Sequence, residues 1–150
     1  MSKQEQPMEL NTILKRAIEF HGHFGPFLVI GVRMGLIGLR ELKSEKDSKK
    51  LRVTASLKYS VPFSCILDGI QVTTGCTLGN QRLTLKDAPD ISAEFQLPNK
   101  NRVTITVNQN AFKKLKKELQ IEGIPDLKIQ ELAHTITSMP ETDLFLVERE

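Results

Sequence analysis

A mostly apolar stretch of about 16 residues, from Phe24 to Leu39, limits the possible folds more than any other part of the chain, and it contains Arg33. Pro26 suits the first turn of a helix, where its missing N–H group costs nothing, and the apolar pattern continues to Leu42. We therefore expect a helix from Pro26 to Leu42. A membrane span needs roughly 20 apolar residues, so we do not expect this helix to cross a membrane.

Glycines recur along the same stretch at spacings of four and three residues, at Gly31, Gly35 and Gly38. Each glycine costs roughly 1 kcal/mol relative to alanine in the interior of a helix. We expect close approach of another backbone to offset this cost. The approaching backbone belongs either to the same domain or to a second copy of the chain.

Length and composition predict one soluble globular domain. The chain has 150 residues, of which 39% are hydrophobic and 26% are charged, as in ordinary domains of this size. The formal net charge of +3 is too small to indicate binding to nucleic acid or to a membrane. The lysines between Lys113 and Lys117 are expected to form a solvated helix surface. The polar segment from Met1 to Pro7 lacks the apolar core of a signal peptide, which predicts a cytoplasmic protein.

The hydrophobic pattern places helices at both ends of the chain and strands in the middle. The expected helices cover 10–20, 26–42, 65–72, 111–119 and 129–136, and the expected strands cover 51–59, 83–85, 91–97, 103–107 and 144–147. Two of these strands flank the turn-forming residues 98–101 and predict an antiparallel hairpin. We predict a single α+β domain over 1–150, with a mostly antiparallel central sheet packed against helices from the N- and C-terminal parts.

Cysteine and histidine are scarce, with 2 and 3 copies respectively. Two cysteines cannot build a disulfide-dense scaffold, a four-cysteine zinc site or an iron–sulfur cluster. Four of these five residues lie in two short glycine-containing segments, and the fifth, His134, lies in an expected helix. The two segments are therefore the candidate sites of chemistry.

The first segment places His21 and His23 on either side of Gly22, at the corner between the first two expected helices. Neutral imidazole is the commonest protein ligand for zinc-like metals. The glycine permits a turn in which the two rings converge on one ion. The alternative is that both histidines are polar loop residues that cap backbone groups.

The second segment spaces Cys65, Asp68 and Gln71 three residues apart, on one face of a short expected helix. Cys65 lies in the first turn, where the helix dipole is expected to lower the thiol pKa and favour the thiolate. A thiolate attacks electrophiles or binds soft metals. The alternatives are a buried structural cysteine and an aspartate that is solvated or caps the helix.

A turn-rich loop follows, from Gly75 to Asn80, and contains Cys76. Its glycines allow backbone amides to approach a ligand closely. The loop lacks the Lys-Ser/Thr ending of a phosphate-binding P-loop. Cys65 and Cys76 are too far apart in sequence for a CxxC redox pair, and a reversible disulfide between them stays open as an alternative.

Together these segments resemble the family of proteins similar to FmdE, the E-type component of formylmethanofuran dehydrogenase. The resemblance covers roughly residues 10–120 and rests on Phe20-His21-Gly22-His23, Pro26, Gly31-Val32-Arg33-Met34-Gly35, Cys65, Asp68-Gly69-Ile70-Gln71 and Thr74-Gly75-Cys76-Thr77-Leu78-Gly79-Asn80. It implies an α+β core that forms a homodimer. It also implies a connection to methanogenesis, through the molybdenum or tungsten enzyme that makes formylmethanofuran. The C-terminal zinc finger of some members is absent here, since no cysteine follows Cys76.

Carried onto this sequence, the resemblance implies a divalent metal, with zinc first and nickel or iron as alternatives. The implied metal ligands are His21, His23 and Cys65, with Asp68 or Cys76 completing or supporting the shell. The candidate catalytic residues are Cys65 and Asp68, and the candidate cofactor-binding residues are Gln71, Thr74 and Gly75.

Two classes of function follow from such a site. The first is a metal-binding accessory protein without turnover of its own, whose expected partners are a second copy and a molybdenum or tungsten enzyme complex. The second is a small metal- or cysteine-dependent enzyme of unknown substrate, in which Cys65 acts with His21 or His23 as base. An open coordination position favours catalysis, and a closed shell favours a structural or delivery role. A third interpretation leaves the site empty and makes the domain an interaction module.

Overall fold

A central sheet of five strands and six helices make up the structure, a computed structural model that describes residues 10–150. The strands are β1 (Arg52–Leu57), β2 (Leu83–Asp87), β3 (Ser92–Gln96), β4 (Arg102–Val107) and β5 (Phe145–Arg149). The helices are α1 (Leu10–His21), α2 (Pro26–Leu42), α3 (Cys65–Thr74), α4 (Gln109–Leu119), α5 (Asp126–Ser138) and α6 (Glu141–Leu144). The expected α+β class is confirmed.

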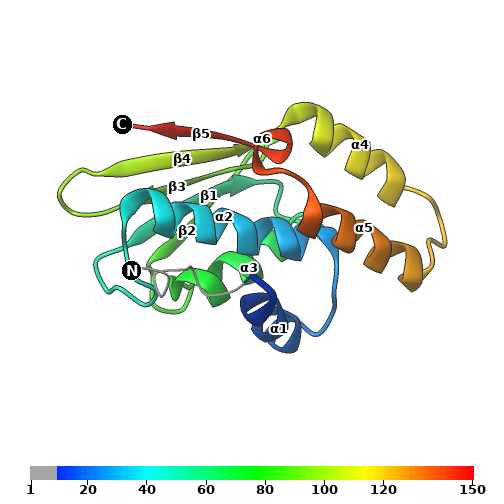
Figure 1. The fold of residues 1–150 in the computed structure, drawn as a ribbon, viewed down its shortest axis with the longest axis horizontal. Coiled ribbons are helices and arrows are strands. Elements are labelled where there is room, and N and C mark those ends of the chain that lie inside the picture. The colour runs from blue at the N-terminus through cyan, green and yellow to red at the C-terminus, as the bar shows by residue number, and fades with distance from the viewer. Residues whose placement is uncertain (1–9) are drawn as a thin grey trace.

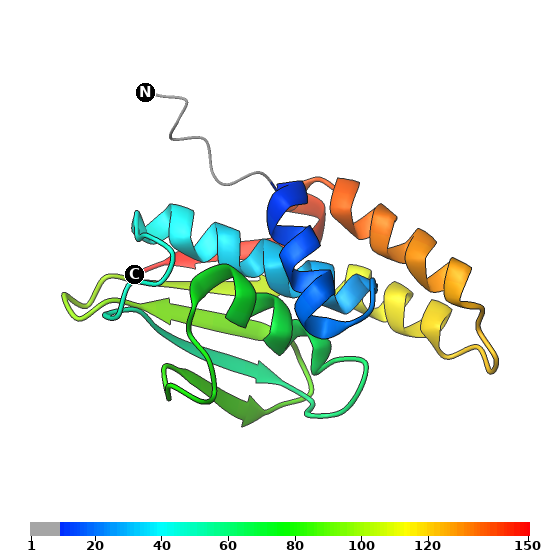
Figure 2. The ribbon, with the colours of Figure 1, turned by 90° about the horizontal axis from the view of Figure 1, so that it is seen from below.

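The strand order in the sheet is β2-β1-β3-β4-β5, and only the β1–β2 pair is parallel. Parallel neighbours need a crossover connection, and α3 supplies it between β1 and β2. The predicted hairpin is β3–β4, which pairs Ser92 with Thr106 and Gln96 with Arg102. Helices α2 and α3 cover one face of the sheet and α1 packs beyond them, while α4 and α5 extend from one end (Figures 1 and 2).

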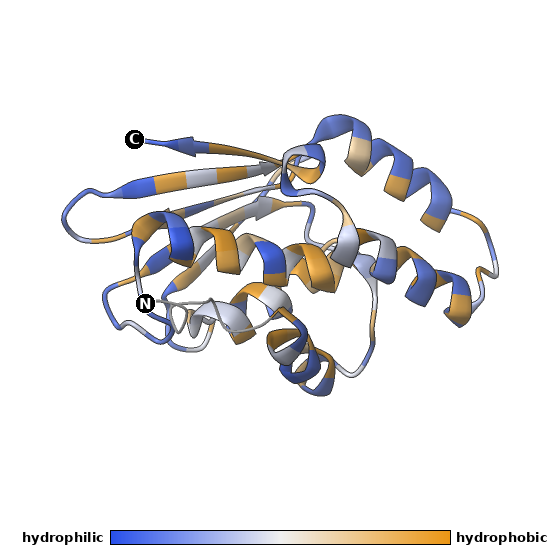
Figure 3. Ribbon diagram, viewed as in Figure 1, coloured by the Kyte–Doolittle hydropathy of each residue, from blue (hydrophilic) through white to orange (hydrophobic). Residues whose placement is uncertain are grey.

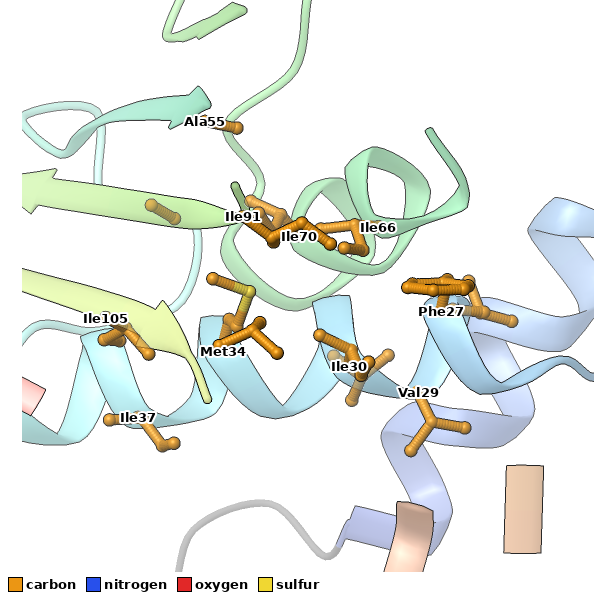
Figure 4. Packing of buried hydrophobic residues seen from close by; sticks show 14 of the residues in the cluster. Phe27, Val29, Ile30, Met34, Ile37, Ala55, Ile66, Ile70, Ile91 and Ile105 are labelled. Atoms are coloured by element: carbon orange, nitrogen blue, oxygen red, sulfur yellow. The ribbon is translucent and has the colours of Figure 1, made fainter. Parts of the chain in front are cut away.

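The core lies between this face of the sheet and helices α2 and α3. Strands β1 and β4 bury every second residue, as their alternating sequences predict. Ile30 and Met34 of α2 meet Ile66 and Ile70 of α3 and the inward side chains of the sheet, such as Ile105 (Figure 4). The apolar side of each element accordingly faces this layer (Figure 3).

The glycines of α2 allow the close approach that the sequence predicts, and they do so inside the domain. A Cβ atom on Gly31 would collide with the backbone carbonyl oxygen of Ile66 in α3. On Gly35 it would lie 2.7 Å from Cβ of Thr73, and on Gly38 it would lie 2.5 Å from the Phe95 ring of β3. Helix α2 therefore sits against both α3 and the sheet at a distance that larger residues would prevent.

Some element boundaries differ from the sequence-based expectation. Helix α3 continues to Thr74 instead of ending at Val72, and it stops where Gly75 adopts a left-handed conformation with φ +80°. The four-residue helix α6 is too short to produce a hydrophobic period, and it shifts the last strand toward the C-terminus, to Phe145–Arg149.

The expectation that the apolar stretch does not cross a membrane agrees with the structure. No helix within residues 10–150 is long and apolar enough to do so. The polar segment from Met1 to Pro7, on which the expectation about a signal peptide rests, lies outside the described residues.

Candidate functional site

A cavity of about 290 Å³ lies at the N-terminal end of α2, where the two candidate segments meet. His21 and His23 reach it from the α1–α2 turn, and Cys65 reaches it from the start of α3. The rest of its lining is apolar or glycine and consists of Gly25, Pro26, Phe27, Leu28, Val61, Pro62, Leu119 and Ile129. The fold therefore brings three of the predicted ligands to the wall of one apolar cavity.

A hydrogen bond joins the two candidate segments. Nδ1 of His21 lies 2.6 Å from Oδ2 of Asp68, and Nε2 of Gln71 donates to the other carboxylate oxygen at 3.3 Å. An ionised carboxylate only accepts hydrogen bonds, so the ring proton of His21 lies on Nδ1. Its Nε2 is then the nitrogen left for a ligand, which is the usual arrangement for metal-binding histidines.

His23 is more exposed and is directed to a different partner. Its Nε2 lies 3.5 Å from Oδ1 of Asp126, at the start of α5, and its side chain is 43% exposed. The centroids of the His21 and His23 rings are 6.3 Å apart. Gly22 between them has φ +91°, a conformation that favours glycine. Within residues 10–150, no group of three or more histidine, cysteine, aspartate and glutamate side chains is already arranged to hold a metal ion.

The environment of Cys65 corrects the expectation of a stabilised thiolate. Burial raises the pKa of the Cys65 thiol, and the nearby Asp68 carboxylate raises it further. A backbone hydrogen bond at the first turn of α3 acts in the opposite direction and is outweighed. The predicted direction was wrong because loss of solvent around a half-buried thiol exceeds the effect of the helix terminus.

Cys76 is not brought to the cavity. It is fully buried, and its Sγ donates to the carbonyl oxygen of Leu51 at 3.4 Å. Burial also raises the pKa of this thiol. Both cysteines are free thiols in the described structure, so the alternative of a disulfide is not realised. Cys76 has the surroundings of a structural cysteine.

The three candidate cofactor-binding residues hold the loop that follows α3. Oε1 of Gln71 accepts from the backbone N–H of Leu78 at 3.0 Å. The buried hydroxyl of Thr74 donates to the carbonyl of Ile70 at 2.7 Å and accepts from the N–H of Cys76 at 3.0 Å. Gly75 caps the helix. Their part in binding a cofactor stays a prediction.

Comparison with known proteins decides the family. The sequence model described as "FmdE, Molybdenum formylmethanofuran dehydrogenase operon" matches residues 20–146. The chain belongs to the FmdE family. This match covers both segments of the cavity and nearly the whole described fold, so it confirms the resemblance found in the motifs.

Two known proteins illustrate the extent of the similarity. A "Probable S-adenosyl-L-methionine-binding protein" of Archaeoglobus fulgidus is 43% identical over 79 residues, which are 53% of this chain and 22% of that protein. The chain thus matches only 22% of the length of this relative. A crystal structure of a tungsten formylmethanofuran dehydrogenase FmdE-like protein from Syntrophus aciditrophicus shares the fold. Its TM-score is 0.62 at 17% identity, covering 95% of this chain and 72% of that chain.

Several residues of this FmdE site were not predicted from the sequence. Asp126 follows Pro125 at a helix start, where an acidic residue is common for local reasons, and nothing local identifies His23 as its partner. The apolar wall formed by Leu119 and Ile129 comes from helices that follow the histidines by about 100 residues. The remaining histidine, His134, is exposed on α5, in line with the expected ordinary helix position.

Proposed function

We propose that this FmdE-family protein is a cytoplasmic metal-binding accessory protein of a molybdenum or tungsten formylmethanofuran dehydrogenase. The proposed ligands are His21, His23 and Cys65. The supporting observation is that these three side chains line one cavity, while Asp68 holds Nδ1 of His21 and leaves Nε2 available. A mixed histidine and cysteine set suits zinc first, and nickel or iron second.

Binding requires a small rearrangement at His23. The contact between His23 and Asp126 is exposed, with side chains 43% and 73% accessible, and exposed pairs of this kind contribute little free energy. The His23 ring can therefore turn from Asp126 toward a metal at low cost. A coordinated thiol loses its proton even when its pKa is otherwise raised, so Cys65 can serve as a ligand. Three protein ligands leave a fourth position open.

Cobalt binding and elemental analysis test the proposal together. We expect about one metal ion per chain, with the absorption band of cobalt–thiolate charge transfer. The double variant His23→Ala/Cys65→Ala should lose both the metal and the band. The control His134→Ala removes an exposed histidine outside the cavity and should retain both. Equal metal content in the wild type and the double variant would contradict the proposed ligand set.

The alternative of a cysteine-dependent enzyme is less well supported. Its nucleophile would be the Cys65 thiolate, but burial and Asp68 raise the pKa of that thiol. Without a metal, the thiol form therefore predominates at neutral pH. Turnover with the metal removed, abolished by Cys65→Ala alone, would favour the enzyme over the accessory protein.

Binding of S-adenosyl-L-methionine is a second candidate, which the Archaeoglobus fulgidus relative suggests through its 43% identity over 79 residues. Equilibrium dialysis of the purified chain against labelled S-adenosyl-L-methionine tests it directly. Saturable binding at one site per chain supports this candidate, and no retained label at millimolar ligand contradicts it.

The proposal includes a homodimer with the cavity near the boundary between the two copies. Support comes from exposed apolar side chains beside the cavity: Val61 lines it and is 81% exposed, and Phe20, next to His21, is 61% exposed. Size-exclusion chromatography with light scattering at micromolar concentration should give twice the chain mass. A monomer under these conditions would contradict the dimer without affecting the metal site.

A further inference from the structure

A second hollow, of about 440 Å³, lies at the opposite end of β1 from the histidine cavity. Its lining consists of Lys49, Lys50, Arg52, Gln96, Leu97 and Pro98, and we refer to it as the basic hollow. Arg52 and Gln96 are paired in the register of β1 and β3. Strand β1 begins at Arg52 and leads toward Val61 and Pro62 of the other cavity. A strand of six residues spans about 20 Å, so the two sites are separate.

The charge of the basic hollow is uncompensated. Three of its six lining residues are cations, and no carboxylate among residues 10–150 lines it. Lys49, Lys50 and Arg52 are exposed and form no ion pair within the described part of the chain. By contrast, nearby Arg102 is paired with Glu94 and Glu150. A concave site lined by charge of one sign concentrates the field on an incoming anion.

The loop that carries the two lysines is held in place before any ligand arrives. The backbone N–H of Asp47 donates to the carbonyl of Thr74 at 2.9 Å, and the N–H of Leu51 donates to the carbonyl of Ser48 at 3.3 Å. The Arg82 guanidinium donates to the carbonyl of Ser48 from the other side. Leu51, next to Lys50, is fully buried. Fixing the backbone reduces the entropy lost when an anion binds.

We propose that the basic hollow binds a small phosphorylated molecule that carries at least two negative charges. A guanidinium such as that of Arg52 binds phosphate oxygens in pairs, and lysines add point charges. The side-chain amide of Gln96 supplies a neutral donor at the same edge. A volume of about 440 Å³ is in the range of small-ligand pockets.

A small molecule fits this hollow better than a nucleic acid does. Single-stranded nucleic acids bind through aromatic side chains that stack on bases, and the hollow has none among its described lining residues. The net charge of the chain is only +3, so the positive charge is local and does not form an extended groove. The ligand is therefore recognised through its phosphate groups.

Isothermal titration calorimetry with pyrophosphate, at a low ionic strength of about 50 mM where screening is weak, tests the proposal. We expect one site per chain. Lys49→Gln/Lys50→Gln and Arg52→Gln should each weaken binding by about 10-fold or more, as loss of charge-assisted hydrogen bonds predicts. Arg52→Lys should be intermediate because it keeps the charge but loses the paired geometry.

The matched control is Lys113→Gln/Lys117→Gln, which removes the same charge from the exposed face of α4. It should change the affinity by less than about twofold. No pyrophosphate binding, or an equal loss in the control, would overturn the proposal. Tighter binding of citrate would overturn the assignment to phosphate. Tighter binding of a single-stranded RNA that is lost in Arg52→Gln would replace the small molecule with a nucleic acid.

Discussion

At the scale of single residues, the contact between His21 and Asp68 is the most informative one for the site. It joins the end of α1 to the first turn of α3 and fixes the position of the ring proton on His21. The carboxylate is in turn contacted by Gln71, whose own carbonyl holds the loop at Leu78. The orientation of the proposed ligand thus depends on a chain of three polar side chains.

The variant Asp68→Asn should weaken metal binding by about 10- to 100-fold, which is the usual effect of losing a group that orients a ligand. The neutral amide no longer fixes the proton of His21 on Nδ1. Competition between the protein and a chromophoric chelator measures the affinity for zinc. The exposed control Asp90→Asn should bind as the wild type does, and an unchanged affinity in Asp68→Asn would remove Asp68 from the site.

The two cysteines should differ in reactivity and in pH dependence. Cys65 is half-buried with a raised pKa, so its alkylation by iodoacetamide should still be rising above about pH 9. Asp68 contributes to raising that pKa, so Asp68→Asn should move the midpoint to lower pH. Cys76 is fully buried and should react only after unfolding. Mass spectrometry of metal-free protein resolves the two sites, and prior labelling of Cys76 would contradict this assignment.

At the scale of elements, the contact between α2 and α3 depends on glycines from both helices. Gly31 of α2 faces the carbonyl of Ile66, and a Cβ on Gly69 of α3 would lie 2.6 Å from the carbonyl oxygen of Leu28. The crossover helix is therefore held against the central helix by backbone proximity. Because α3 also carries Cys65 and Asp68, this contact determines where those side chains lie relative to the α1–α2 turn.

The variant Gly31→Ala should lower the free energy of unfolding by about 2 kcal/mol or more, since the added methyl group collides with backbone that cannot rotate away. The gain in helix propensity, about 1 kcal/mol, only partly offsets this loss. Urea denaturation followed by circular dichroism provides the measurement. The control Gly79→Ala has open space around its Cβ, with the nearest atom at 3.7 Å, and should stay within about 0.5 kcal/mol of the wild type.

At the scale of the whole molecule, long-range ion pairs connect the C-terminal segment to the central helix. Arg40 near the end of α2 donates to both carboxylate oxygens of Glu141 in α6, at 2.8 and 3.0 Å. Arg33, earlier in the same helix, donates to the carbonyls of Ile136 and Met139. The segment between α5 and β5 is thereby fixed over α2, and the last strand is placed beside β4.

The hydrogen bond from Arg40 lowers the pKa of Glu141 below its usual range. A lowered pKa in the folded state means that the ionised form stabilises the fold above the ordinary pKa, and that this stability is lost as the pH falls through the lowered value. Both side chains are partly exposed, so Glu141→Gln should cost at most about 1 kcal/mol at neutral pH. In urea titrations the difference should vanish below about pH 3, and the exposed control Glu122→Gln should show no such trend.

Most of the secondary structure could be predicted without the fold, because each long element carries its own hydrophobic period. Helix α2 begins at Pro26 and ends at Leu42 as expected, and the β3–β4 hairpin follows from alternation around one turn. The amino-acid sequence also marked His21, His23 and Cys65, since scarce residues beside glycines or at a helix start can be found without knowing their neighbours in space. Family membership follows from the same motifs.

Which of these residues meet depends on the tertiary structure. The fold placed Cys76 beside Leu51 in the core and Cys65 at the cavity, although both thiols look alike in sequence. It reversed the expected direction of the Cys65 pKa, because desolvation depends on what packs around the thiol. It also paired His23 with Asp126. Such contacts form between segments distant along the chain, so local periodicity carries no information about them, and packing of the whole fold determines them.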